Sequence, residues 1–157
     1  MELLLGKTTL ANKIKEEFND KAIILSHDFY YKSLSNITLE ERMKRNYDCP
    51  SAYETDLLID HVKFLLTGKT IERPIYSYTE RLRQKDTVTV NVAPIIIIEG
   101  ILVLENDELA DLMDIKIFVD TDSDIRFTRL IRKRYKRKRF KFGLSYSKIY
   151  HYIETNA

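Results

Sequence analysis

The sequence has 157 residues, of which 44% are hydrophobic and 11% aromatic, and its formal net charge is +2. This length fits one domain, and the aromatic content excludes a mainly disordered chain. Four Gly, three Pro and a single cysteine, Cys49, exclude collagen-like chains, an intrachain disulfide framework and a cysteine-based zinc site. No apolar run is long enough to span a membrane and the first residues lack a signal-peptide pattern, so we expect a cytoplasmic protein without a membrane partner.

Hydrophobic periodicity predicts helices that alternate with short strands. Leu10, Ile14 and Phe18 recur every four residues, as on an amphipathic helix. Thr38 and Glu41 have the spacing of a capping box, which starts a helix. In chain order we expect a helix over 8–18, a strand over 22–25, helices over 38–45 and 55–66, paired strands near 71–75 and 87–92, a strand over 95–98, a helix over 107–113, a strand over 115–119 and a helix from 122 onward.

This order of elements predicts an α/β fold with a largely parallel sheet. The run at 95–98 is continuously apolar and that at 115–119 is apolar except for Lys116, which is typical of buried strands of a parallel sheet. In such sheets the functional side chains lie just beyond the C-terminal ends of the strands. Asp28, Glu99 and Asp120 each follow a predicted strand. We therefore expect them at one edge of the sheet.

Three short motifs indicate phosphate chemistry. Gly6-Lys7-Thr8-Thr9 has the form of the end of a phosphate-binding loop, in which helix amides and the lysine bind phosphate and the hydroxyl binds Mg²⁺. Glu99 ends a run of four isoleucines, where a carboxylate can hold Mg²⁺. Asp28 is placed to orient and deprotonate a substrate hydroxyl. Taken singly, each is equally compatible with an ordinary cap of a helix, strand or turn.

Together, these motifs and their neighbours resemble the uridine/cytidine kinase family, within the phosphoribulokinase and uridine kinase group of P-loop kinases. The matching segments are 6–11, 26–32, 46–52, 74–78, 99–104 and 117–122. The resemblance implies a three-layer α/β P-loop NTPase kinase fold with a mostly parallel sheet and a small β-hairpin insertion near 70–92. It implies one nucleoside-kinase-like domain over 1–157, incomplete because the first strand and the C-terminal part are missing, with a basic lid at about 126–143.

The resemblance also implies a reaction, which is the phosphorylation of the 5′-hydroxyl of uridine or cytidine by ATP (or GTP) with Mg²⁺, a step of pyrimidine salvage. The expected partners are a nucleoside and a nucleotide, and the family suggests a homo-oligomer. The residues that it assigns are Asp28 and Lys7 for catalysis, Gly6, Lys7, Thr8, Thr9, Arg132 and Arg137 for the nucleotide, Thr8 and Glu99 for Mg²⁺, and Tyr31, Tyr47, Asp48, Tyr76, Tyr78, Arg81 and Arg83 for the nucleoside.

The sequence departs from the family pattern in four places. The earlier loop glycines are absent, Arg81 replaces a histidine near the base, the lid lacks one arginine and its acids, and the sequence stops at Ala157 where the family continues. A catalytically impaired or truncated paralogue that only binds nucleotide is therefore the alternative to an active kinase. Phosphoribulose and pantothenate also stay open as acceptors, although the ribose and tyrosine segments favour a nucleoside.

The basic segment supports a further alternative. Residues 126–141 hold ten Lys or Arg and no acidic residue, so the net charge of +2 minus these ten leaves −8 on the rest. Such a run is either a nucleotide lid, a solvated basic helix or a nucleic-acid-binding module whose affinity depends on salt. No DNA- or RNA-reading motif accompanies it, so we expect no specific nucleic-acid partner.

Overall fold

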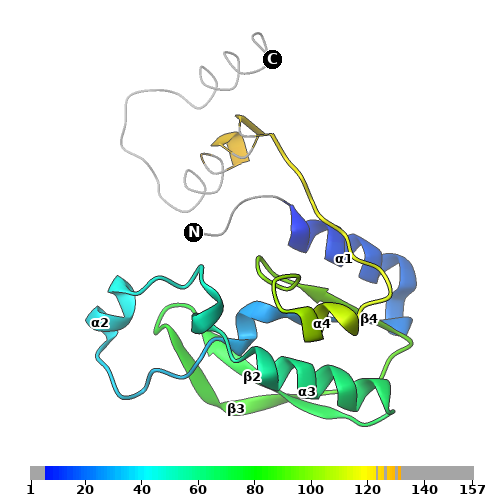
Figure 1. Ribbon diagram of the computed structural model, residues 1–157, viewed down its shortest axis with the longest axis horizontal. Helices are drawn as coiled ribbons and strands as arrows, with labels where there is room; N and C mark the ends of the chain where they lie inside the picture. Colours follow the sequence, from blue (N-terminus) through cyan, green and yellow to red (C-terminus); the bar gives the residue numbers. More distant parts are fainter. Residues whose placement is uncertain (1–5, 123, 126, 130, 132–157) are drawn as a thin grey trace. The chain divides into compact units, whose positions relative to one another are not determined.

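The computed structural model describes residues 6–122, 124–125, 127–129 and 131 (Figure 1). Its elements are α1 (Lys7–Phe18), η1 (Asn19–Lys21), β1 (Ala22–Ser26), η2 (His27–Tyr30), α2 (Leu39–Lys44), η3 (Pro50–Ala52), α3 (Thr55–Leu66), β2 (Ile71–Ser77), β3 (Leu82–Val90), β4 (Ile95–Glu99) and α4 (Asp107–Asp111). Residues up to Asp120 form one unit and those from Thr121 onward another. In the second unit the described residues between Asp124 and Ile131 are helical, as expected.

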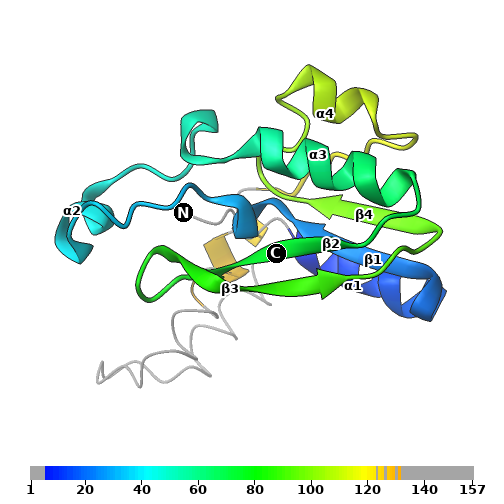
Figure 2. The ribbon, with the colours of Figure 1, turned by 90° about the horizontal axis from the view of Figure 1, so that it is seen from below.

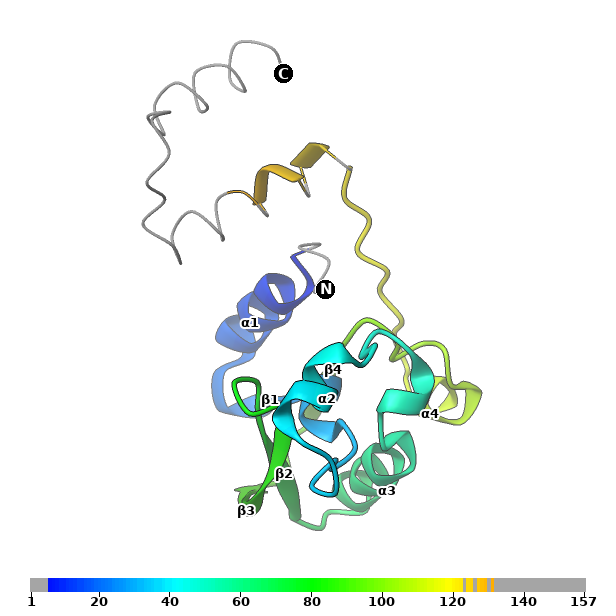
Figure 3. The ribbon, with the colours of Figure 1, turned by 90° about the vertical axis from the view of Figure 1, so that its left-hand side faces the viewer.

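The first unit has three layers around a parallel strand pair. β1 and β4 pair in parallel, with Ile23 opposite Ile96 and Leu25 opposite Ile98. These four side chains belong to or pack against one core cluster, which α3 completes. α1 contacts the other side of both strands, so that the strands lie between α1 and α3 (Figures 2 and 3). This arrangement confirms the three-layer α/β fold. Within the described ranges, no helix has the length and apolarity that a membrane span needs.

α3 supplies half of the buried residues of the main core cluster, and its limits agree with the sequence prediction. Leu58, Val62 and Leu65 are buried at helical spacing and pack with Leu25 of β1. After the helix, Gly68 takes a left-handed φ of 81°. Its N–H donates to Leu65 O at 3.0 Å and that of Lys69 to Phe64 O at 2.9 Å, which satisfies the last carbonyls of the helix.

Apart from the predicted strand over 115–119, the remaining elements up to Asp111 are also present, with small shifts at their ends. β2 and β3 form an antiparallel hairpin with an irregularity between Pro74 and Tyr76. Thr38 and Glu41 make the expected capping box at the start of α2. Helix α4 ends at Asp111 rather than at 113. The expected hairpin insertion is therefore confirmed at 71–90.

The prediction of a strand over 115–119 is wrong. The segment has no regular secondary structure, and Ile115 and Phe118 are 78% and 81% exposed. A strand requires a neighbour for its backbone groups, which local sequence does not supply. Among the described residues, the parallel sheet contains β1 and β4 alone. For the same reason β4, expected to be buried on both faces, is only half-buried along its length.

Candidate active site

The two strand-end carboxylates lie at one edge of the parallel pair. Glu99 is the last residue of β4 and stands opposite Ser26, the last residue of β1, while Asp28 follows in η2. Thr8, in the first turn of α1, donates from its Oγ1 to Glu99 Oε2 at 3.1 Å. Asp120, expected at the same edge, follows the exposed irregular segment and does not line the pocket described next. The pairing of β1 with β4 and the packing of α1 on both strands therefore bring Thr8, Asp28 and Glu99, which are far apart in sequence, into one site.

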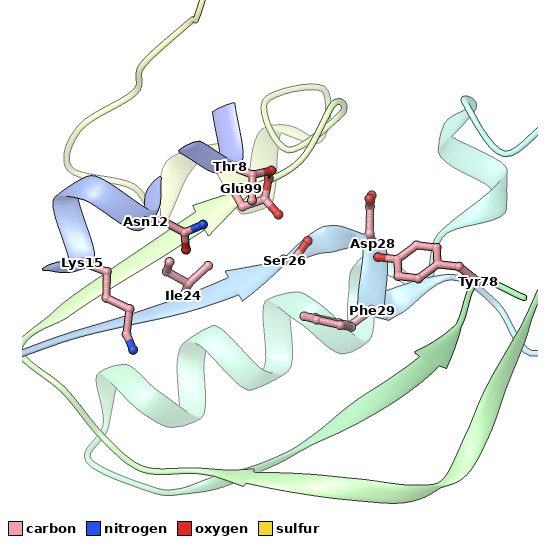
Figure 4. A pocket seen from close by; sticks show the side chains of 9 residues that line it. All are labelled: Thr8, Asn12, Lys15, Ile24, Ser26, Asp28, Phe29, Tyr78 and Glu99. Carbon is pink, nitrogen blue, oxygen red and sulfur yellow. Dashed lines mark hydrogen bonds between the residues drawn. The ribbon is translucent and has the colours of Figure 1, made fainter. Parts of the chain in front are cut away.

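These residues line a pocket with a volume of about 420 Å³ (Figure 4). Tyr78 of the hairpin closes it on the side of Asp28. The pocket also contains five residues that the sequence analysis did not assign, namely Asn12, Lys15, Ile24, Ser26 and Phe29. A signal for two of them was available, because Asn12 and Lys15 follow Thr8 at i+4 and i+7 and so share its face of α1.

The start of α1 suits a phosphate. Gly6 has a left-handed φ of 86°, which glycine adopts without strain, and its carbonyl accepts from Leu10 N at 2.9 Å. No described side chain caps this helix start, and its first turn contains no acidic residue. Among the described residues, no side chain therefore competes with a phosphate for the amides and the partial positive charge of this helix end, beside Lys7 and Thr9.

Thr8 and Glu99 form an oxygen donor set that fits Mg²⁺, because Mg²⁺ prefers hydroxyl, carboxylate and water ligands. The described residues contain no group of three or more His, Cys, Asp or Glu side chains able to hold a metal. Since Mg²⁺ retains several waters and binds phosphate oxygens, two protein oxygens are enough at such a site. The residues present therefore fit the ion that the sequence motifs predict.

The tyrosines expected at the nucleoside form one aromatic cluster. Tyr31 and Tyr76 are buried, with ring centroids 5.0 Å apart, and Tyr47 meets Tyr31 edge-on at 5.3 Å. Tyr78 meets Tyr76 edge-on at 5.5 Å and is 57% exposed. Because the inner rings pack against one another, Tyr78 offers the most open aromatic face on the pocket wall.

The other expected nucleoside residues surround this cluster. Asp48 is exposed beyond α2, and its backbone N–H donates to Asn46 Oδ1 at 2.9 Å. Arg81 has a left-handed φ of 50° in the hairpin turn, and its guanidinium lies 5.2 Å from the Tyr47 ring centroid. The nucleotide residues Arg132 and Arg137, with most of the basic lid, lie outside the described residues.

Arg83 is bound within the protein. It forms an ion pair with Glu54, and its Nη2 donates to the carbonyl oxygen of Tyr31 at 2.8 Å. These contacts tie β3 to the segment that follows η2. In this structure Arg83 therefore holds the backbone at Tyr31, a residue of the aromatic cluster. Its assignment to the nucleoside stays a prediction.

His27 is the first residue of η2, next to Asp28, and its burial leads us to expect that the stability of the protein depends on pH. It is 1% exposed, and burial lowers its pKa from 6.5 to about 4. Below pH 6.5 the unfolded chain therefore binds this proton before the folded protein does. We expect the free energy of unfolding to fall by about 2 kcal/mol from this residue between pH 7 and pH 5, and to be nearly independent of it above about pH 7.5. Urea unfolding at both pH values should show a smaller loss in His27→Gln than in the parent. Equal losses would contradict this account.

Gly100 allows the chain to turn closely over His27 after β4. A Cβ at this position would lie 2.7 Å from His27 Cβ and 2.8 Å from Val103 Cγ1. Gly100→Ala is therefore expected to destabilise the protein by about 1–3 kcal/mol through overpacking. The urea midpoint measures the effect, and an unchanged midpoint would show that the loop shifts without cost.

Comparison with known proteins agrees with this geometry. A sequence model described as the phosphoribulokinase / uridine kinase family matches residues 5–156. The chain belongs to this family. It is 48% identical over 134 residues to the uridine kinase of Clostridium novyi and 50% identical over 125 residues to that of Halalkalibacterium halodurans. These alignments cover 85% and 79% of this chain but only 64% and 59% of the relatives, so the chain spans about three fifths of their length.

Solved structures show the same fold. A structure described as a possible uridine kinase from Bacillus stearothermophilus has a TM-score of 0.56 at 18% identity, covering 84% of this chain and 74% of that one. A structure from Silicibacter sp. TM1040 has a TM-score of 0.67 at 17% identity, covering 91% of this chain and 70% of that one. These likenesses support the P-loop kinase fold.

Proposed function

We propose that this chain transfers the γ-phosphoryl group of ATP to the 5′-hydroxyl of uridine or cytidine, as a step of pyrimidine salvage in the cytoplasm. One observation supports the proposal most strongly. A candidate base, Asp28, shares one pocket with the Thr8–Glu99 oxygen pair, beside a helix start that no described side chain caps. Relatives that are about 50% identical and named uridine kinases support the nucleoside as acceptor.

The chemistry requires positioning and charge compensation more than a strong base. Asp28 orients the 5′-hydroxyl and accepts its proton as the new O–P bond forms and the bond to the β-phosphate oxygen breaks, releasing ADP. Lys7, with the amides of Gly6, Thr8 and Thr9, holds the phosphate oxygens. Thr8 and Glu99 would hold Mg²⁺, which when bound would supply charge that neutralises the phosphate oxygens.

The nucleoside is proposed to lie along the hairpin side of the pocket. Tyr78 offers its exposed face for stacking on the base, with Tyr47 and Tyr76 behind it. The exposed Asp48 carboxylate can accept hydrogen bonds from two ribose hydroxyls. Arg81 presents only donors, which suits the carbonyl oxygens of uracil.

Purified chain incubated with MgATP and, separately, uridine, cytidine and ribulose 5-phosphate tests the proposal. We expect UMP and CMP by chromatography, no product when Mg²⁺ is chelated, and no phosphorylation of the sugar phosphate. Phosphorylation of ribulose 5-phosphate alone would assign the chain to another acceptor class within the family.

A nucleotide-binding protein without turnover is the second candidate. The observation that favours it is the sequence Leu3-Leu4-Leu5 before Gly6, where phosphate loops carry glycine. Calorimetric binding of MgATP by a folded chain that forms no product from any acceptor would establish this alternative.

A further inference from the structure

Tyr53 lies behind the site, and the sequence analysis did not assign it. It is 2% exposed and stands directly after η3. Its ring stacks on His27 on one side, at a centroid distance of 4.0 Å, and on Tyr31 on the other, at 4.3 Å. Its backbone forms an antiparallel bridge with Tyr31. Ring and backbone are therefore both fixed, and the position of the hydroxyl is fixed with them.

This hydroxyl reaches two oxygens of the candidate site. It lies 2.7 Å from Tyr31 Oη and 3.4 Å from Asp28 Oδ1. Tyr53 has one proton to donate, Tyr31 has one of its own, and an ionised carboxylate has none. The Tyr53 hydroxyl is placed as the donor to both oxygens. Because either hydroxyl of a tyrosine pair can donate, the Tyr53 proton serves Asp28 when Tyr31 donates to Tyr53. Burial raises the pKa of Tyr53 far above its ordinary value, so the donor keeps its proton.

We propose that Tyr53 is a positioning residue, whose hydroxyl donates to Asp28 and so holds this carboxylate toward the acceptor hydroxyl. The inference rests on the proposed function for the identity of the acceptor. The bond to Asp28 is long in the absence of substrate, and such bonds commonly tighten in the reactive complex. A rigid donor that needs no reorganisation during the reaction is the usual means of aligning a catalytic group.

Tyr53→Phe removes the hydroxyl and keeps the stacked ring. Tyr30→Phe is the matched control, because Tyr30 is equally buried in η2, and its hydroxyl lies 3.0 Å from His61 Nδ1 instead of reaching Asp28. Both variants therefore lose one buried tyrosine hydroxyl. Comparable melting temperatures would show that the two are equally folded.

Two readouts separate positioning from packing. The first is the carbon-13 NMR titration of the Asp28 carboxyl group, for which loss of a donor is expected to move the midpoint to higher pH in Tyr53→Phe but not in Tyr30→Phe. The other titratable groups that line the pocket, belong to the tyrosine cluster or lie near Tyr53 are unchanged in both variants. They are Lys15, His27, Tyr31, Tyr47, Asp48, Tyr76, Tyr78 and Glu99. The second is turnover of uridine, for which Tyr53→Phe is expected to lower kcat about 10-fold with little change in KM.

Identical titrations of Asp28 in the two variants and the parent would overturn the inference, as would an unchanged kcat in Tyr53→Phe. If the parent chain gives no UMP, the proposed function fails. The carboxyl titration then still decides by itself whether Tyr53 holds Asp28.

Discussion

Asp28→Asn is expected to lower kcat for uridine by about 10²–10⁴-fold, the range for loss of a positioned general base. The amide has the size of the carboxylate but is uncharged and cannot accept the proton of the 5′-hydroxyl. In the proposed function the start of α1 and the Thr8–Glu99 pair bind the nucleotide, so the affinity for MgATP should remain close to that of the parent. Single-turnover phosphorylation and calorimetry measure the two effects separately.

Asp86→Asn is the matched control for this substitution, because Asp86 is an exposed carboxylate on β3 that does not line the pocket. It should leave both kcat and nucleotide affinity unchanged. A kcat within a few-fold of the parent in Asp28→Asn would remove Asp28 from the reaction and transfer the role of base to water or to another pocket residue.

Lys7→Ala is expected to lower kcat by about 10²–10³-fold, the cost of removing one preorganised donor to developing negative charge. Lys7 follows Gly6 at the start of α1, where the helix amides add partial positive charge to that of its ammonium group. Because the proposed contact of this group with phosphate exists in the bound and reacting states alike, MgATP affinity should also fall. Rates at saturating and subsaturating MgATP distinguish the two losses.

Lys13→Ala is the control on the same helix, since Lys13 is exposed and does not line the pocket. Equal effects of the two substitutions would indicate a general loss of positive charge instead of a specific contact. Unchanged kinetics in Lys7→Ala would show that the helix start does not bind the nucleotide.

The sequence predicted those parts of the fold that local patterns determine. The 12-residue helix α3 follows from its apolar spacing and the glycine after its end, and the limits agree. The parallel pairing of β1 and β4 follows from their alternation with helices. The segment at 115–119 is also mainly apolar but has no strand partner among the described residues, and Ile115, Ile117 and Phe118 are exposed. Pairing depends on distant residues, so the pattern alone was insufficient.

The sequence likewise predicted some residues of the candidate site and not others. Asp28 and Glu99 were predictable because parallel strands bring their C-terminal ends to one edge of a sheet. Tyr53 was not, because nothing in its local sequence distinguishes a tyrosine that packs in the core from one that reaches a carboxylate. For Arg83 the family resemblance implies a role at the nucleoside, and the structure adds contacts with Glu54 and the Tyr31 carbonyl oxygen that local sequence does not indicate.

The most direct test of the central proposal compares uridine with 5′-deoxyuridine, which lacks only the proposed acceptor hydroxyl. Purified chain and MgATP should convert uridine to a product identical to UMP by mass spectrometry and phosphorus-31 NMR, and should leave 5′-deoxyuridine unmodified. A phosphorylated product from 5′-deoxyuridine, or no product from either nucleoside with a folded chain that binds MgATP, would contradict phosphoryl transfer to the 5′-hydroxyl at this site.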